Sequence, residues 1–375
     1  MRVHVVDPSA YSRPYDHELC AALARAGAEV DLITSAFPYG RVPEPRGYGV
    51  REVFYRGVPG GAASRLRSAA KLAAHVPDML RYRRAARAAD VVHFQWLPLQ
   101  WLDAHLLPDR PLVLTAHDLL PREPRPGQAR AQRRLYHAVD AVVVHSRYGR
   151  RKLVEELGVD AAKVHVVHHG AFTHLVGAVT DGALPPELDG GVTCGPAPGK
   201  RPVALFFGLL RAYKGVEVLL EAWRGVEDAE LWIVGHPRIP LERLRAAAPA
   251  GVRFAPRFVE DAELAACFAR ADVVVLPYLR TERFDQSGVL ATALAFGKAT
   301  VVSDVGSFAE VASAGAARLV PGGDVVALRE ALRELLGDAA MRERLGAAAR
   351  SLAHSHYSWD AAAQLTLALY RELTG

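Results

Sequence analysis

The sequence has few cysteines and no long apolar run, and each shortage excludes a class of protein. The three cysteines, Cys20, Cys194 and Cys267, are odd in number and far apart, which fits neither a disulfide framework nor a zinc site. No uninterrupted apolar stretch reaches the ~18 residues that a membrane span requires. Residues 1–7 enter a strand-like run directly, without the apolar core of a signal peptide. These features predict a cytoplasmic protein.

The charge of the chain is modest in total but uneven along its length. The formal net charge is +5, whereas residues 56–87 contain a single acid, Asp78, among many basic residues. Such a region favours an anionic partner, either a lipid surface at the inner face of the membrane or a phosphorylated molecule, over nucleic acid. A solvated helical face would explain the same charges and stays open. The basic residues are Arg56, Arg65, Arg67, Lys71, Arg81, Arg83, Arg84 and Arg87.

Short apolar runs that alternate with helical segments divide the chain into two successive series. Such alternation predicts parallel sheets covered by helices on both faces. Residues 176–200 are rich in Gly and Pro and read as a linker. We predict an α/β protein with two Rossmann-like domains facing a cleft, residues 1–175 and 201–357, and a final helix, residues 358–375. The expected strands are residues 3–6, 30–33, 90–94, 111–114, 141–144, 164–167, 203–207, 231–234, 253–254, 273–276 and 300–303.

Residues 277–310 have the pattern of an anion site at the carboxyl end of a parallel strand. An apolar strand ends at Pro277, a polar loop follows, and Ser287 and Gly288 open a short helix. Unpaired backbone N–H groups at a helix start attract phosphate, and glycine lets the ligand approach the backbone closely. We predict backbone contacts to a phosphate from Ser287, Gly288 and Val289.

A second strand, loop and helix start, residues 205–215, carries two cations. Arg211 and Lys214 follow the carboxyl end of the strand, where a diphosphate would lie, and Gly208 begins the loop. Positioned cations stabilise the charge of a departing diphosphate without proton transfer, each contact being worth about 1.5–3 kcal/mol. A solvated basic loop is the alternative reading. We predict that both cations act in catalysis.

Together these segments resemble the donor-binding region of retaining glycosyltransferases of family 4, which have the GT-B fold and use nucleotide sugars. The resemblance lies in residues 293–298 and 303–306 and in Glu310. The two signature glutamates of the family fall on Phe284 and Thr292, so the signature itself is absent. The resemblance implies transfer of a hexosyl or related group from a nucleotide-diphosphate sugar to an acceptor hydroxyl, with retention of anomeric configuration. It also implies that the C-terminal helix packs back on the N-terminal, acceptor-binding domain.

The resemblance implies donor contacts at the strand ends of the second domain. Asp285 or Glu282 would replace the first missing glutamate as acceptor for sugar hydroxyls, and Thr292 would offer a hydroxyl to the ribose. Glu310 would lie near the donor, or would brace a turn. Loops implied to flank the nucleotide base contain His236, Phe258 and Val259. The predicted donor-binding set is Gly208, Arg211, Lys214, His236, Phe258, Val259, Asp285, Ser287, Gly288, Val289, Thr292 and Glu310.

In the first domain, His117 ends a strand and matches the active-site histidine of the family. It is the one candidate base, with a satisfied structural histidine as the alternative. The loop at residues 8–15 lacks the glycine pair common in the family, which favours a different geometry on the acceptor side. An anionic or lipid-linked acceptor fits the basic region. The predicted acceptor-binding residues are Tyr11, Asp16, His93 and Asp118.

No residue pattern indicates a metal or a cofactor. The neighbouring His168 and His169 would point to opposite faces of a strand, and no Asp-x-Asp motif of metal-dependent transferases is present. We expect neither a metal nor a cofactor, with the nucleotide sugar as co-substrate. Two alternatives stay open: an epimerase or phosphorylase on the same fold, and a non-catalytic partner subunit that binds the sugar nucleotide.

Overall fold

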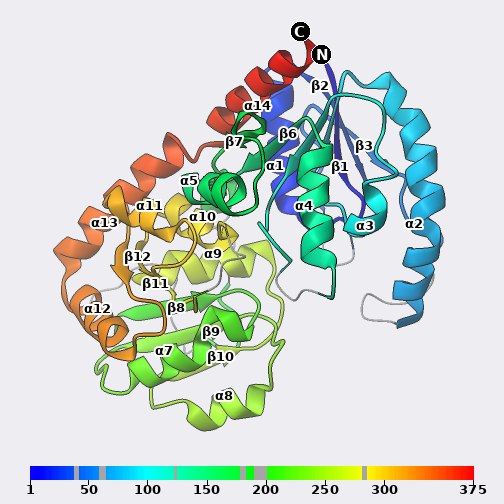
Figure 1. Ribbon diagram of the computed structural model, residues 1–375. Coiled ribbons are helices and arrows are strands. Elements are labelled where there is room, and N and C mark those ends of the chain that lie inside the picture. The colour runs from blue at the N-terminus through cyan, green and yellow to red at the C-terminus, as the bar shows by residue number, and fades with distance from the viewer. Residues whose placement is uncertain (38–41, 59–64, 122–124, 178–182, 190–200, 281–284) are drawn as a thin grey trace. The chain divides into compact units, whose positions relative to one another are not determined.

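The computed structural model describes residues 1–37, 42–58, 65–121, 125–177, 183–189, 201–280 and 285–375 (Figure 1). By their contacts, the residues form two compact units. The first unit comprises Met1–Gly170, Arg283–Asp285 and Trp359–Gly375, and the second comprises Ala171–Glu282 and Gln286–Ser358.

The first unit contains a seven-stranded sheet in which every pairing is parallel. The strands are short and apolar, and the four residues of β4, β5 and β6 are buried throughout, as expected for a sheet covered on both faces. The spatial order is β3-β2-β1-β4-β5-β6-β7. The strands are β1 (Arg2–Asp7), β2 (Glu29–Thr34), β3 (Gly49–Glu52), β4 (Val91–Phe94), β5 (Leu112–Thr115), β6 (Ala141–Val144) and β7 (Val164–Val166).

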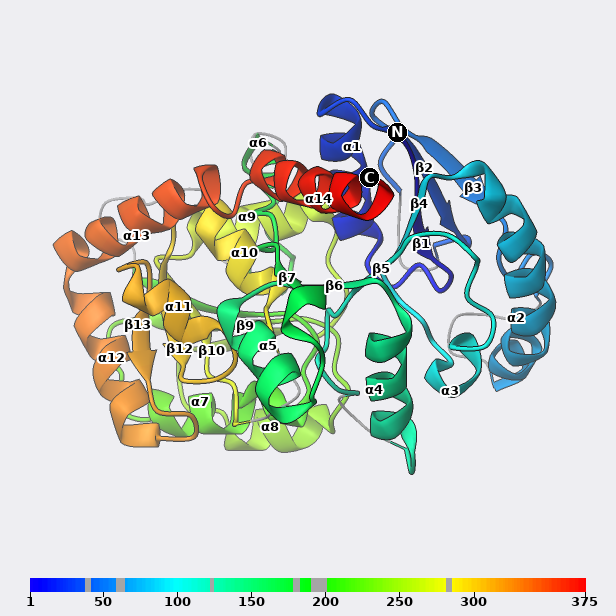
Figure 2. The ribbon, with the colours of Figure 1, turned by 45° about the horizontal axis from the view of Figure 1, so that its top comes forward.

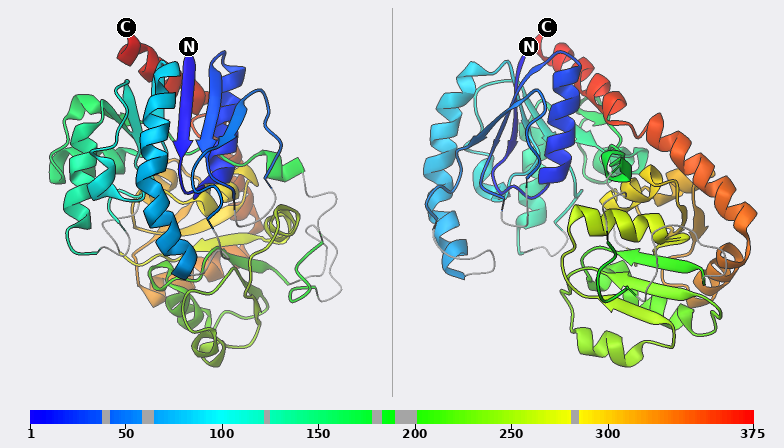
Figure 3. Two further views of the ribbon diagram at one scale, coloured as in Figure 1. Left: turned by 90° about the vertical axis from the view of Figure 1, so that its right-hand side faces the viewer. Right: turned by 180° about the vertical axis from the view of Figure 1, so that it is seen from behind.

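Helices cover both faces of this sheet (Figure 3). The connection from β1 to β2 runs in the opposite direction across the sheet from the connection between β3 and β4. Because parallel crossovers are right-handed, the two intervening helices lie on opposite faces. The last helix lies beside the first one (Figure 2). The helices are α1 (Arg13–Arg25), α2 (Arg65–Ala85), α3 (Gln100–Asp103), α4 (Gln128–Ala138), α5 (Arg147–Arg151) and α14 (Trp359–Thr374).

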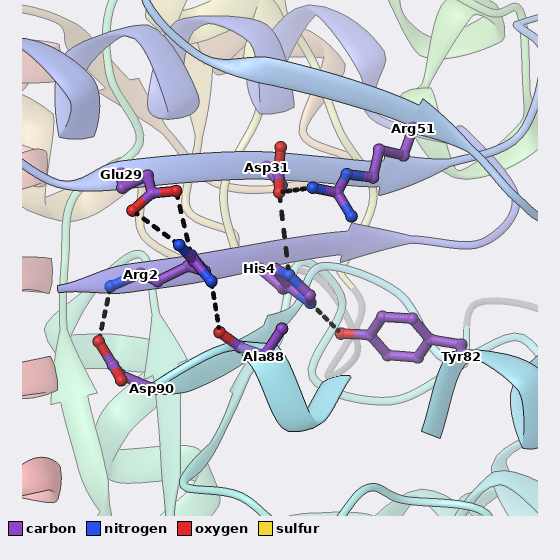
Figure 4. Close-up of polar contacts among 8 residues, drawn as sticks. All are labelled: Arg2, His4, Glu29, Asp31, Arg51, Tyr82, Ala88 and Asp90. Atoms are coloured by element: carbon purple, nitrogen blue, oxygen red, sulfur yellow. Dashed lines mark hydrogen bonds and ion pairs between the residues drawn. The ribbon is translucent and has the colours of Figure 1, made fainter. Parts of the chain in front are cut away.

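Ion pairs join the outer strands of the first sheet (Figure 4). Arg2 Nε on β1 lies 3.0 Å from Glu29 Oε1 on β2, and Arg51 on β3 lies 2.8 Å from Asp31 on β2. Exposed pairs of this kind contribute only about 0–1 kcal/mol each. Burial of one large apolar side chain such as Phe94, by contrast, contributes about 1.5–3 kcal/mol. The apolar core, more than these ion pairs, therefore stabilises the sheet.

The second unit repeats the plan with a six-stranded parallel sheet in the order β10-β9-β8-β11-β12-β13. Its core contains Trp223 and Phe206, both essentially inaccessible to solvent. The strands are β8 (Val203–Phe207), β9 (Glu230–Val234), β10 (Val252–Ala255), β11 (Val273–Leu276), β12 (Ala299–Ser303) and β13 (Arg318–Val320). The helices are α6 (His174–Gly177), α7 (Val216–Trp223), α8 (Leu241–Ala247), α9 (Asp261–Arg270), α10 (Gly288–Ala295), α11 (Phe308–Ser313), α12 (Val325–Gly337) and α13 (Ala339–His354).

The predicted fold class, two Rossmann-like parallel sheets, is confirmed. The eleven expected strands all form, within one or two residues at their ends. The structure adds two strands that the sequence did not predict, β3 and β13. Both lie at the edge of a sheet, and both lack a continuous apolar run.

Candidate functional site

The loops at the carboxyl edge of the second sheet approach one another so closely that only glycine fits at three positions. Gly208, Gly215 and Gly235 have φ angles of +108°, +70° and +141°, conformations that other residues rarely adopt. A Cβ on Gly235 would lie 2.1 Å from the carbonyl oxygen of Gly208. A Cβ on Gly215 would lie 1.9 Å from the carbonyl oxygen of Pro277. The loops after β8, β9 and β11 therefore form one closely packed backbone surface.

Lys214 lies at this surface with most of its side chain buried. It ends a 3-10 turn that follows Arg211, and it is only 8% exposed. Its Nζ lies 5.4 Å from the centre of the Tyr278 ring, where the ring face attracts a cation. A Cβ on Gly208 would lie 2.6 Å from the same Nζ. Arg211 is half-buried. The structure thus places Lys214 beside Gly208, with Arg211 in the same loop after β8.

The first turn of α10 also lies next to Gly208. A Cβ on Gly208 would lie 3.4 Å from Cγ2 of Val289. Ser287 is the residue before the helix, and its side chain makes no capping hydrogen bond. The first amide groups of the helix have no partner within the helix itself, so they remain donors for a ligand. Gly208, Lys214 and the start of α10 are therefore brought together within the second unit.

Three polar side chains that the sequence analysis missed support the start of α10. Gln286 Oε1 accepts hydrogen bonds from the Ser287 N–H at 3.0 Å and from Ser307 Oγ at 3.1 Å. Ser287 Oγ lies 3.2 Å from the hydroxyl of Tyr278. Nε2 of the buried Gln286 has no partner among the residues that the structure describes. The sequence offered one indication of Tyr278, Gln286 and Ser307, which is their position in the loops next to the predicted anion site.

Two further predicted donor residues, Thr292 and Glu310, lie in the helices α10 and α11. The hydroxyl of Thr292 donates to the carbonyl oxygen of Gly288 at 2.9 Å, so its hydrogen is used within the helix and only its oxygen lone pairs remain. Glu310 is half-buried in the first turn of α11. Phe284 and Glu282 lie outside the described residues.

An aromatic pair forms where the loops after β9 and β10 meet. The rings of His236 and Phe258 are stacked, with centres 4.9 Å apart and an angle of 8° between their planes. Phe258 is 51% exposed, and Val259 next to it is half-buried. A flat, exposed aromatic face of this kind can stack on a planar ligand such as a nucleotide base.

In the first unit, His117 is held by hydrogen bonds at both ring nitrogens. Its Nδ1 lies 3.2 Å from Nε2 of His145, and its Nε2 lies 3.1 Å from Oε1 of Gln95. His145 Nδ1 in turn lies 2.9 Å from the carbonyl oxygen of Val167, to which it must donate. Burial lowers the pKa of His145 to about 3, so its Nε2 accepts and His117 Nδ1 donates. The hydrogen of His145 is thereby placed on Nδ1. On the other side of His117, Nε2 of Gln95 has no partner among the described residues, and turning this side-chain amide by 180° presents its N–H to Nε2 of His117 in place of a second acceptor.

Aromatic rings enclose His117. Trp96 is stacked on it, with ring centres 5.0 Å apart and planes inclined by 15°, and Tyr15 meets it edge-on at 4.8 Å. Tyr15 also contacts the rings of His169 and Trp359. Burial raises the pKa of Tyr15 and lowers that of His169 to about 4, so both side chains are neutral near pH 7.

The predicted acceptor residues separate into buried and exposed groups. Tyr11 is 60% exposed, with its ring 5.6 Å from that of Trp96, and Asp118 is half-buried after β5. His93 is 1% exposed, and its nitrogens bond Tyr370 at 2.6 Å and Thr115 at 2.7 Å. His93 is therefore a core histidine that ties α14 to the sheet.

Asp16 is also fully buried. Its carboxyl accepts from Ser12 Oγ at 3.2 Å. Burial, followed by the neighbouring carboxylate of Asp7, raises the pKa of Asp16 well above its usual range. Trp96 Nε1 donates to the same Ser12 oxygen at 2.8 Å. Asp16 thus braces the loop after β1 instead of lying on its surface.

Asp285 belongs by its contacts to the first unit. It is fully buried, and its carboxylate accepts from the backbone N–H of His145 at 2.8 Å and from Ser146 Oγ. A Cβ on Gly149 would lie 2.9 Å from that carboxylate. These bonds give Asp285 a structural role next to His145, which the sequence analysis did not foresee.

In the part of the chain that the structure describes, no group of three or more His, Cys, Asp or Glu side chains is arranged to hold a metal ion. No helix in the same part of the chain combines the length and apolar character of a membrane span.

Comparison with known proteins finds similar sequences and the same architecture. A model described as Glycosyltransferase Family 4 matches residues 15–174, and one described as Glycosyl transferases group 1 matches residues 201–338. D-inositol 3-phosphate glycosyltransferase from Xylanimonas cellulosilytica is 32% identical, covering 96% of this chain and 91% of that protein. Phosphatidyl-myo-inositol mannosyltransferase from Mycolicibacterium smegmatis is 29% identical over 100% of this chain and 95% of that protein. The crystal structure of Anabaena Alr3699/HepE in complex with UDP superimposes with a TM-score of 0.73 at 16% identity, covering 99% of this chain and 100% of that chain.

Proposed function

The chain belongs to glycosyltransferase family 4 and is a GT-B glycosyltransferase that uses a nucleotide sugar, and we propose that it transfers the sugar to an acceptor hydroxyl with retention of anomeric configuration. The observation that carries the proposal is the assembly of Lys214, Gly208 and the first turn of α10 at one edge of the second sheet. Cationic and N–H donors there suit a diphosphate leaving group.

We propose that Arg211, Lys214 and the amide groups at the start of α10 stabilise the negative charge that develops on the departing diphosphate. Lys214 is held in place before reaction by its burial and by the Tyr278 ring. Preorganised donors in a site of low dielectric constant lose little energy to reorganisation, and loss of one donor from the oxyanion hole of an acyl-transfer enzyme costs about 2.7–4 kcal/mol. In this proposal the two side chains supply the positive charge that other transferases take from a metal, and no cofactor takes part.

The stacked pair of His236 and Phe258 suits the nucleotide base of the donor. Its exposed face lies at the carboxyl ends of β9 and β10, the edge at which open α/β sheets bind nucleotides. Structural neighbours were solved with UDP or UDP-glucose, which supports a uridine nucleotide as the first donor to test.

The hydrogen bonds of His117 indicate that another group takes the proton of the acceptor hydroxyl. Both of its ring nitrogens are engaged, by His145 and by Gln95, so it would have to break a hydrogen bond to act as a base. We propose that His117 orients the reacting sugar from a fixed position. The leaving phosphate oxygen then accepts the proton of the acceptor hydroxyl as that hydroxyl attacks from the same face.

We propose that the acceptor is anionic and that the protein acts in the cytoplasm, at the inner face of the membrane. Two relatives are named for inositol 3-phosphate and phosphatidyl-myo-inositol. Helix α2 supports a lipid surface, since Leu72 and Leu80 are 54% and 45% exposed among its basic residues. The fraction of protein that sediments with vesicles should rise with their anionic lipid content, and it should be lower for Leu72→Ser than for the unchanged protein. Binding that does not depend on the anionic lipid content would contradict the membrane proposal.

Calorimetric titration with UDP, GDP and their sugar conjugates tests the donor site. Lys214→Met and Arg211→Met, which keep the side-chain length but remove the charge, should each weaken diphosphate binding at least tenfold. Arg243→Met is the matched control, because Arg243 is exposed on α8 and pairs with Glu217. If the two variants bind a donor as tightly as the control does, the proposed role of these cations is wrong.

A further inference from the structure

A hollow of about 370 Å³ lies at the carboxyl ends of β2 and β3 in the first unit. It is large enough for a ligand the size of a phosphorylated hexose. None of the predicted donor-binding or acceptor-binding residues lines it, although Arg56 of the predicted basic region does. Its walls include Ser35, Ala36, Glu52, Phe54, Tyr55 and Arg56.

Ser35 supplies a buried hydroxyl without a protein partner. It follows the last residue of β2, is 2% exposed, and its Oγ has no hydrogen-bond partner among the described residues. A buried hydroxyl in that state costs about 1–3 kcal/mol, and this cost is removed when a ligand or water bonds to it. The orphaned hydroxyl therefore points to a polar occupant of the hollow.

Arg56 supplies the charge. Its Nε donates to the backbone carbonyl oxygen of Glu52, which fixes the guanidinium at the wall of the hollow. Within the described part of the chain, its two terminal nitrogens have no bonded partner. These nitrogens can bind both oxygens of a phosphate or carboxylate at once. The carboxylate of Glu52, also in the wall, can accept only from hydroxyl or N–H donors.

Tyr55 holds this loop in a conformation that a non-glycine residue rarely adopts. Its φ is +54°, which costs on the order of 1–3 kcal/mol unless the surroundings impose it. Its backbone N–H donates to Asp78 at 2.8 Å. Its hydroxyl lies 2.7 Å from Nδ1 of His75, and Nε2 of His75 lies 2.5 Å from Asp103. Both the backbone and the hydroxyl of Tyr55 are thus held in place. The side chains of Tyr55, His75 and Asp103 form a chain of hydrogen bonds, here called the relay, and all three are buried.

The direction of the relay follows from its chemistry. The carboxylate of Asp103 can only accept, so His75 donates from Nε2. With Nε2 as the donating nitrogen, Nδ1 is the nitrogen of His75 that can accept the hydroxyl proton of Tyr55. Because the relay ties α2 and α3 to the loop after β3, it keeps Arg56 at the hollow. Tyr55 is a positioning residue in this arrangement and Arg56 is a binding residue.

We propose that this hollow binds a small polyhydroxylated anion through Arg56 and Ser35, with the Tyr55–His75–Asp103 relay holding Arg56 in place. This proposal depends on the proposed function in one respect, which is that the bound anion is taken to be the sugar acceptor or its headgroup. A phosphate ester and a carboxylate share the required chemistry. Bonds from ligand hydroxyls to Glu52 and Ser35 distinguish such a ligand from a bare anion.

Calorimetry on the full chain without donor tests the proposal, with glucose 6-phosphate, gluconate, glucose and inorganic phosphate as probes. At least one of the two hydroxylated anions should bind more tightly than both glucose and inorganic phosphate. Arg56→Gln should weaken that binding at least tenfold, and Ser35→Ala should weaken it about twofold to tenfold. Arg84→Gln is the matched control, since Arg84 is exposed on α2 and does not line the hollow.

Tyr55→Phe keeps the ring and removes the bond to His75. It should weaken binding of the anionic probe and leave binding of glucose unchanged, a difference that a general loss of stability would not produce. UDP binding should be equal in all of these variants, so a failure here is distinguishable from a failure of the donor site. Binding of no probe, or binding that is unchanged in Arg56→Gln, would overturn the proposal.

Discussion

The two units carry the same sheet architecture but build their sites in different ways. In the second unit the site is mainly backbone: three glycines with positive φ and the open first turn of α10 bring the loops together. In the first unit the site is mainly side chain: His117 is held by His145 and Gln95 and enclosed by aromatic rings. The difference teaches that a backbone site is sensitive to a single added methyl group, whereas a side-chain site is sensitive to protonation and packing.

Gly215→Ala should have the largest effect, because it attacks the backbone site directly. The new Cβ would meet the Pro277 carbonyl oxygen at 1.9 Å, at a residue with φ of +70°. Strain of about 1–3 kcal/mol adds to the clash, so we expect a lower melting temperature and loss of UDP binding. Gly337→Ala is the control, since nothing lies within 4 Å of its Cβ position at the end of α12. Retained UDP binding in Gly215→Ala would show that the loop contact is not needed.

Gly170→Ala makes the equivalent change in the first unit and should cost less. The added Cβ would lie 2.2 Å from the Trp359 ring, but the backbone at Gly170 is ordinary, so the strain is one of packing, about 1–3 kcal/mol. Urea unfolding should show this loss, and Trp359→Leu in the same chain should recover part of it. If the double variant is less stable than either single variant, the clash is not the cause.

Stability at acid pH should depend on the buried histidines of the first unit. Burial lowers the pKa of His93 and His145 to about 3 and that of His169 to about 4, against about 6.5 in the unfolded chain. Below pH 6.5 the unfolded chain therefore binds protons that the folded one does not. Each such histidine then removes up to about 1.4 kcal/mol of stability per pH unit as the pH falls.

The matched variant for this comparison is His93→Gln. Its stability should fall less steeply than that of the unchanged protein between about pH 6 and pH 4. Asp7 and Asp16 act in the opposite sense, because burial raises their pKa values and the folded state then holds protons that the unfolded chain releases. The difference between the two proteins, measured by urea unfolding at each pH, removes that contribution. Equal slopes would contradict the assignment of His93 as neutral and buried.

The sequence predicted the sheets, and the loops that meet at the carboxyl edge of the second sheet, better than the rest. Central strands such as β11 are continuous apolar runs, and Gly208, Lys214 and Ser287 lie in short strand, loop and helix segments that can be read locally. Edge strand β3 was missed, because its residues Gly49–Glu52 have exposed charged positions and no apolar run.

The side-chain site of the first unit was harder to predict, because its parts come from distant segments. His145 and Tyr15 contact His117 from distant parts of the chain, and Trp359 on α14 packs against Tyr15. No local sequence pattern predicts contacts between such distant segments. His93 and Asp16 were predicted to line the acceptor pocket, with core or rim packing as the alternative. Their burial depends on Tyr370 and Ser12, which complete their hydrogen bonds.

The contacts of α14 also bear on the order in which the units are completed during synthesis. Residues Trp359–Gly375 belong to the first unit, where Trp359 packs against Gly170 and Tyr370 bonds His93. This segment is synthesised after every residue of the second unit. The first unit, although begun earlier, therefore lacks these contacts until synthesis has passed through the whole of the second unit.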